Sequence, residues 1–152
     1  MQSSEPPIPG KEEWSGYEND LDARYAHDQL FGKSIDQVQQ LFEWPGPLSL
    51  AEDLHFMPLG AFQYYIFAFV RFLQSARAAE DSDAASCFLR LLIARESEEP
   101  GSVSKIYTQL ESTVEFVASH QSYFDADLDI YGSFIDLAEQ LRTLCMRRDG
   151  DA

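Results

Sequence analysis

The run MPLGAFQYYIFAFVRFL, Met57 to Leu73, constrains the fold of this chain more than any other stretch. From Tyr64 to Val70 it contains seven consecutive residues without a charge or an amide. In a helix, such a run places apolar side chains on every face, so other elements must cover it all round. We therefore predict a helix over about residues 60–79 at the centre of the fold.

A membrane span is the first alternative for this run, and its length argues against that interpretation. A spanning helix needs about 20 mainly apolar residues. Between Asp53 and Arg71 only 17 residues lack an acidic or basic side chain. His55, Pro58 and Gln63 interrupt even these. No Lys or Arg cluster flanks the run as membrane topology requires, so the sequence predicts a buried helix of a protein that does not enter a membrane.

Capping patterns indicate two helices before this run. Ser34 and Gln37 have the spacing of a capping box, which predicts a helix to about Glu43. The motif WPGPLS then breaks the chain, because proline cannot donate a backbone hydrogen bond. Ser49 and Glu52 repeat the capping pattern and predict a further short helix.

Apolar residues at helical spacing predict the remaining helices. The first covers about residues 20–30, with these residues facing inward: Leu21, Tyr25 and Leu30. Another covers about residues 84–96. The clearest amphipathic helix carries Val103, Ile106, Leu110, Val114 and Val117. The last carries Ile130, Phe134, Leu137, Leu141 and Leu144.

These patterns predict an all-α fold, because no stretch alternates in the manner of a strand. The length of 152 residues is typical of one domain. We expect a single-domain bundle of five to six helices over residues 18–148, packed around the aromatic-rich helix. Residues 1–17, rich in Pro, Gly and polar side chains, are expected to be a flexible arm, and residues 149–152 a disordered tail. Trp14 and Tyr17 of the arm have two alternatives, docking on the domain or on a partner.

The charge of the chain restricts its partners. There are 26 Asp and Glu against 11 Lys and Arg, a formal net charge of -15. Nucleic acids and anionic membrane surfaces would be repelled, whereas a basic protein would be attracted. Cys87 and Cys145 are expected to be free thiols, and the N-terminus lacks a secretory signal pattern. We therefore expect a cytoplasmic, bacterial-type protein.

Metal and cofactor chemistry is not predicted. Asp125, Asp127 and Asp129 have the spacing of the start of a calcium-binding loop, but the sixth place of that loop is Ile130 instead of Gly. Glu-x-x-His occurs once, ending at His55, whereas a di-iron bundle needs two such pairs. Neither Cys lies in a short-spaced pair typical of zinc sites.

No catalytic motif was found, and we predict a protein that is not an enzyme. The one open alternative is a Cys-His pair, since such partners meet only in the fold. Small size and strong acidity together are typical of proteins that inhibit a basic toxin or mimic a nucleic acid. By this compositional analogy, we expect an immunity-like or antitoxin-like protein that covers a basic surface or active site, such as that of a toxin domain.

Two sets of site residues follow from these hypotheses. The expected partner-binding surface is formed by Glu111, Glu115, Asp125, Asp127 and Asp129. The alternative is a small-molecule-binding protein or enzyme with a groove near His55, Tyr64 and Tyr65. A third hypothesis is a homodimeric interaction module.

Overall fold

The computed structural model describes residues 6–150, and the side chains of residues 6–147. Within these residues the chain is helical and contains no strand, which confirms the predicted fold class. The α-helices are α1 (Leu21–Leu30), α2 (Ile35–Val38), α3 (Pro47–Phe56), α4 (Leu59–Leu73), α5 (Ser82–Glu98), α6 (Tyr107–Ser119), α7 (Leu128–Tyr131) and α8 (Phe134–Gly150). Short 3-10 helices lie between them or before α1, namely η1 (Tyr17–Asn19), η2 (Gln39–Phe42), η3 (Ala76–Ala78) and η4 (Ser104–Ile106).

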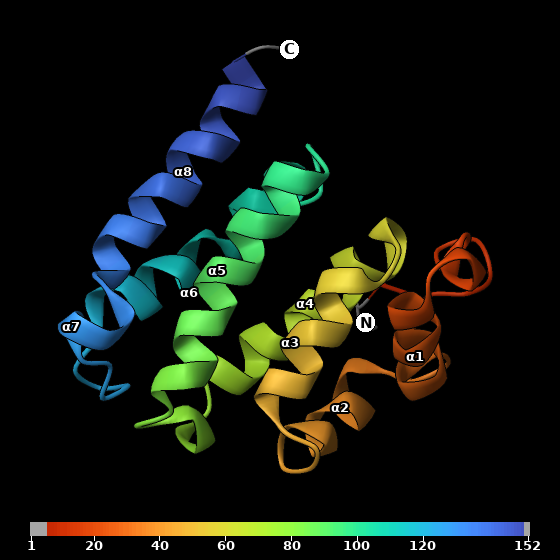
Figure 1. Ribbon diagram of the computed structural model, residues 1–152, viewed down its shortest axis with the longest axis horizontal. Helices are drawn as coiled ribbons and strands as arrows, with labels where there is room; N and C mark the ends of the chain where they lie inside the picture. The colour runs from red at the N-terminus through yellow and green to blue at the C-terminus, as the bar shows by residue number, and fades with distance from the viewer. Residues whose placement is uncertain (1–5, 151–152) are drawn as a thin grey trace, which may run out of the picture.

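The helices form one domain (Figure 1). Helix α8 packs against α5 and α6, and α3 packs against both α5 and α1. Helix α4 contacts α2, α3, α5 and α6. Every residue of α4 from Leu59 to Val70 is buried or half-buried, because apolar side chains occur on all its faces. No helix in the described residues is both long and apolar enough to span a membrane.

The ends of several helices follow directly from local sequence. The capping box of Ser34 and Gln37 is confirmed, with both reciprocal hydrogen bonds present. Asp81 caps α5 by accepting a hydrogen bond from the Ala84 backbone N–H. The predicted capping box of Ser49 and Glu52 is wrong. Helix α3 begins earlier, with Pro47 in its first turn, where the missing N–H of proline costs nothing.

Three other details of the predicted helices are wrong. Helix α4 ends at Leu73, and a turn with η3 covers the rest of the predicted range to residue 79. Leu21 and Tyr25 are 75% and 57% exposed, because α1 buries a different stripe that contains Ala23, Ala26 and Leu30. Ile130 is 74% exposed, since Gly132 has a positive φ of 77° and separates α7 from α8.

The segment before α1 lies against the helices. Trp14 is 1% exposed, so its side chain docks on the domain, which is one of the two alternatives given above. Its ring contacts those of His27 and Tyr65 at centroid distances of 5.2 and 6.1 Å. The Ala61 N–H donates to the Glu13 carbonyl at 3.2 Å. The rest of the predicted arm, residues 1–5, and residues 151–152 of the predicted tail lie outside the described residues.

Candidate functional site

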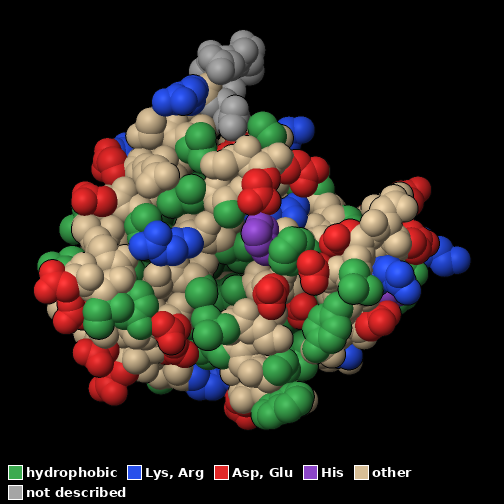
Figure 2. Space-filling view, in the orientation of Figure 1, with side chains coloured by type: hydrophobic (Ala, Val, Ile, Leu, Met, Phe, Trp, Pro, Cys, Tyr) green, Lys and Arg blue, Asp and Glu red, His purple; other side chains and the backbone are tan. Residues whose placement is uncertain are grey.

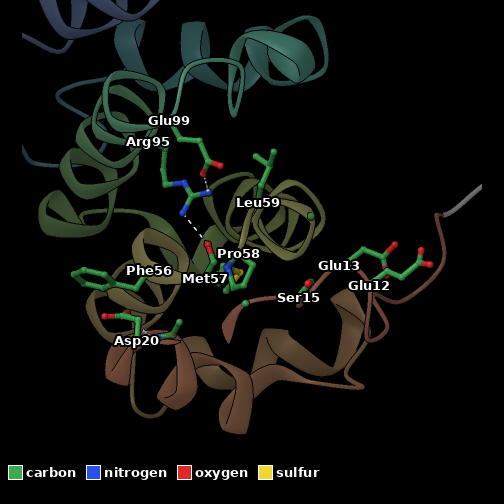
Figure 3. Close-up of a pocket in the computed structure, with 13 residues that line it drawn as sticks. Glu12, Glu13, Ser15, Asp20, Phe56, Met57, Pro58, Leu59, Arg95 and Glu99 are labelled. Carbon is green, nitrogen blue, oxygen red and sulfur yellow. Dashed lines mark hydrogen bonds and ion pairs between the residues drawn. The ribbon is translucent and has the colours of Figure 1, made fainter. Parts of the chain in front are cut away.

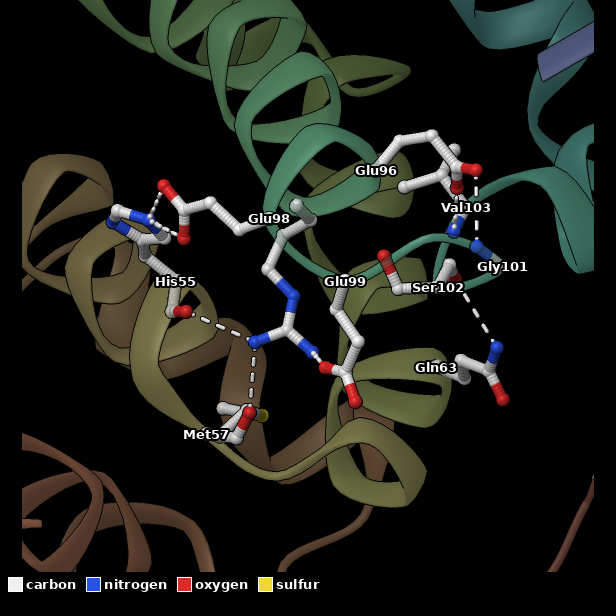
Figure 4. A network of polar contacts seen from close by, with 10 residues as sticks. His55, Met57, Gln63, Glu96, Glu98, Glu99, Gly101, Ser102 and Val103 are labelled. Atoms are coloured by element: carbon white, nitrogen blue, oxygen red, sulfur yellow. Dashed lines mark hydrogen bonds and ion pairs between the residues drawn. The ribbon is translucent and has the colours of Figure 1, made fainter. Parts of the chain in front are cut away.

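The junction of α3, α4 and α5 is built around one buried cation, Arg95. Its guanidinium donates through Nη1 to the carbonyls of His55 and Met57 at 2.9 and 2.8 Å. Nη2 donates to Glu99 at 3.2 Å (Figure 4). The guanidinium carbon lies 4.4 Å from the centre of the Phe62 ring. A cation at this position satisfies carbonyls that the end of a helix leaves without a partner. Arg95 therefore joins α5 to the end of α3.

The next residue, Glu96, is fully buried and is held by backbone groups of the following loop. It accepts hydrogen bonds from the N–H groups of Gly101, Val103 and Ser104 at 3.0, 2.9 and 2.8 Å. Burial by itself raises the pKa of a carboxyl, but these N–H groups hold the pKa of Glu96 below its usual value. A carboxylate with three such partners is stabilised in its ionised form, so Glu96 closes this loop as a structural anion.

Beside Arg95 the surface is hollowed into a groove of about 480 Å³ (Figure 3). Its walls are the segment before α1, the corner between α3 and α4, and the end of α5. The acidic residues of this lining are Glu12, Glu13, Asp20 and Glu99. Because Arg95 already donates to two carbonyls and a carboxylate, the groove presents mainly negative charge to solvent.

The hydroxyls of the two predicted tyrosines form hydrogen bonds with backbone groups between the end of α1 and the start of α2. The Tyr65 hydroxyl donates to the carbonyls of Leu30 and Lys33 at 2.8 and 2.7 Å. The Tyr64 hydroxyl accepts from the Ile35 N–H at 3.3 Å. Burial raises the pKa of Tyr65 far above its ordinary value. These hydroxyls stabilise the backbone at the start of α2.

His55, the third residue of the predicted ligand groove, has its polar partner elsewhere. Its Nε2 lies 3.0 Å from Glu98 Oε1, so it joins the end of α3 to the end of α5 (Figure 4). The structure thus directs the imidazole and the two tyrosine hydroxyls to different partners, on α5 and on the loop before α2.

The five predicted acidic residues lie on two neighbouring segments. Glu111 and Glu115 are one turn apart on α6, and the three aspartates lie in the following loop and in α7. Glu111 is half-buried and the other four are exposed. Among the described side chains, none of the five is in an ion pair. Asp127 caps α7 by accepting from the Asp129 N–H at 2.7 Å. Glu115 also lines a groove of about 210 Å³ between α6 and α8.

Three buried charged residues were missed by the sequence reasoning, namely Asp53, Arg95 and Glu96. One signal for Asp53 is available in the sequence. It lies beside Leu54 and three residues after Leu50, both of which face the core, so it occupies an inward position of α3. Arg95 and Glu96 carry the same signal, since they lie three and four residues after the buried Leu92 on α5. The backbone groups that satisfy them are supplied by the fold.

Comparisons with known proteins give no further assignment: no family model, no curated protein and no solved structure matches this chain. Within the part of the chain that the structure describes, no three His, Cys, Asp or Glu side chains are grouped to hold a metal ion. Cys87 is a free thiol, as predicted, and Cys145 is buried.

Proposed function

We propose that this chain is a non-catalytic binding protein that covers a basic surface or active site of a partner protein, in the manner of an immunity protein or antitoxin. The observation that carries the proposal is the acidic surface on α6 and α7, where Glu115, Asp125, Asp127 and Asp129 are exposed and have no ion-pair partner among the described side chains. We call these four residues together with Glu111 the α6–α7 acidic surface.

The charge of the molecule supports the same proposal. Acidic side chains are spread over the face seen in Figure 2, with hydrophobic side chains between them. The formal net charge of -15 accelerates the encounter with a basic protein and opposes binding to nucleic acids and anionic membranes. Exposed acids without counterions cost little in the free protein, and they gain attractive partners when a basic surface docks on them.

The thiol chemistry of the chain also favours binding over catalysis. Burial raises the pKa of the Cys87 thiol, and Asp83 and Asp81 raise it further, which disfavours the nucleophilic thiolate.

A cytoplasmic, bacterial-type setting belongs to the same proposal. So does the role of α4 as the centre of a five- or six-helix bundle, supported by the contacts of the Phe69 ring with Phe42 and Phe88 at centroid distances of 5.3 and 5.7 Å.

The proposal is tested by affinity capture on the full chain at low and at raised salt, followed by binding kinetics with the purified partner. We expect the captured protein to be basic and to dissociate as salt rises, because screening weakens contacts between exposed charges. Reversal to lysine of Glu111, Glu115, Asp125 and Asp127 should slow association by at least about tenfold.

The matched control reverses four exposed acids outside this surface, Glu12, Glu18, Asp28 and Asp136, and therefore has the same net charge. It should slow association much less than the first variant, because local complementarity outweighs total charge at short range. Equal association rates of both variants would place the partner elsewhere. Capture that does not respond to salt would contradict an electrostatic binding protein.

A further inference from the structure

A second acidic surface lies between α1 and α3. Its residues are separated in sequence from those of the α6–α7 acidic surface. It is a groove of about 270 Å³, which we call the α1–α3 groove. Its lining is Asp22, Tyr25, Ser49, Glu52, Asp53 and Phe56. Three of these six residues are carboxylates and two are aromatic, whereas no Lys or Arg is among them.

Asp53 distinguishes this groove from an ordinary cluster of surface acids. Its side chain lines the groove, yet the residue is only 5% exposed. Its Oδ2 atom is buried and has no hydrogen-bond partner among the described residues. Buried carboxylates normally have donors, and one without them is energetically costly. Among the described residues no hydrogen bond reaches the other oxygen, Oδ1, either, so a cation in the groove would bring the first donor to this carboxylate.

Apolar side chains border the same groove and are accessible to solvent. Tyr25 and Phe56 line the groove, and Leu48 lies outside its lining, on the same stripe of α3 as Glu52 and Phe56 at four-residue spacing. Leu48 is 53% and Phe56 37% exposed, and Tyr25 of α1 is 57% exposed. Aromatic rings beside carboxylates suit an organic cation, whose apolar part and flat head both gain contacts. A hydrated metal ion would gain nothing from the rings.

We propose that the α1–α3 groove binds an arginine or lysine side chain of the basic partner protein, with Asp53 as its charge partner. This inference rests on the proposed function and adds a specific anchor to it. A guanidinium supplies the N–H donors that Asp53 lacks and can stack on Tyr25 or Phe56, so we expect arginine to bind more tightly than lysine. A buried, well-packed anchor of this kind carries much of the affinity in a protein interface.

The charged groups around Asp53 make binding depend on pH. Burial and the neighbouring Glu52 raise the pKa of Asp53 to about 7. From α1, Asp22 and Tyr25 face the groove. From α5, Arg95 is engaged with carbonyls at the end of α3. A bound cation favours the ionised carboxylate, so affinity should rise between pH 6 and pH 8 and binding near pH 7 should release a proton.

The test is an NMR titration of the full chain with acetyl-Ala-Ala-Arg-Ala-Ala-amide at low salt. The neutral control peptide carries citrulline, which has nearly the shape of arginine without its charge. We expect the arginine peptide to shift the amide signals of Asp22, Tyr25, Glu52 and Asp53, and the citrulline peptide to bind at least about fivefold more weakly. Equal binding of the two peptides overturns the inference.

Two variants that each replace one aspartate by asparagine locate the site. Asp53→Asn should weaken binding of the arginine peptide at least about fivefold and remove its pH dependence, whereas Asp125→Asn should change it less than about twofold. Preserved dispersion of the amide signals verifies that each variant is folded. Unchanged binding by Asp53→Asn overturns the inference.

The remaining outcomes separate the two proposals. Shifts that gather on Glu111 and Glu115 instead would overturn the α1–α3 groove and leave the proposed function standing. No shift anywhere, even at low salt, would count against both proposals. Butylguanidinium reproduces the arginine side chain alone, so it should shift the same amide signals as the peptide, and shifts confined to other residues would overturn the groove as the site of the side chain.

Discussion

Two buried carboxylates on helices that pack together, Glu96 of α5 and Asp53 of α3, differ in what surrounds them. Glu96 accepts three backbone hydrogen bonds, and its pKa lies below the usual value. Asp53 has a buried oxygen without a partner, and its pKa is raised to about 7. Burial is similar in both, at 0% and 5% exposure, so the difference comes from the backbone donors at Glu96 and from the negative charge of Glu52 beside Asp53. A buried charge stabilises the fold only where the fold itself supplies its partners.

The largest effect is expected from removing the satisfied carboxylate. Glu96→Ala leaves the N–H groups of Gly101, Val103 and Ser104 without an acceptor, which should lower the free energy of unfolding by about 3–5 kcal/mol. Urea denaturation followed by circular dichroism measures this loss. Glu96→Gln keeps one acceptor oxygen and should lose less. A loss under about 1 kcal/mol for the alanine variant would show that the loop does not depend on this anion.

The pH dependence of stability should have opposite signs for the two carboxylates. For Glu96 the folded pKa is lowered, so its contribution is present above its unfolded pKa and is lost as the pH falls. For Asp53 the folded pKa is raised from 3.8 to about 7, so the folded state is penalised as the pH rises from about 4 to about 7.

Asp53→Asn removes this second dependence. We expect it to raise the free energy of unfolding at pH 8 by about 1–3 kcal/mol and to change it little at pH 4, since the amide is never charged. Thermal unfolding of the variant and the original chain across this pH range checks the sign. A variant less stable than the original at pH 8 would mean that the ionised Asp53 has a stabilising partner.

The smallest effect on stability is expected from the exposed acids. Glu115→Lys on α6 should change the free energy of unfolding by less than about 0.5 kcal/mol, because its side chain is exposed and outside any described ion pair. The same denaturation measurements check this value. A large loss would indicate that the α6–α7 acidic surface is part of the structural framework, and would weaken its assignment as a binding surface.

The predictable parts of the fold were those governed by neighbouring residues. The capping box at Ser34 depends on contacts three positions apart, and the buried stripe of Leu110, Val114 and Val117 on α6 depends on helical periodicity. The predicted start of this stripe at Val103 is wrong, because α6 begins at Tyr107. The contacts of the candidate site were harder to predict from the sequence. His55 pairs with Glu98, which lies 43 positions away, and the Tyr65 hydroxyl donates to two carbonyls that lie 35 and 32 positions away. No local pattern identifies such partners.

The sequence by itself determined the helical class, the acidity and the burial of α4, because periodicity, charge and all-round apolarity are properties of short segments. The tertiary structure decided which face of α1 is buried, leaving Leu21 and Tyr25 exposed. It also decided that Glu96 meets three donors and that Asp53 meets none at its buried oxygen. The physical reason is that the energy of a buried charge depends on groups brought near it from elsewhere in the chain.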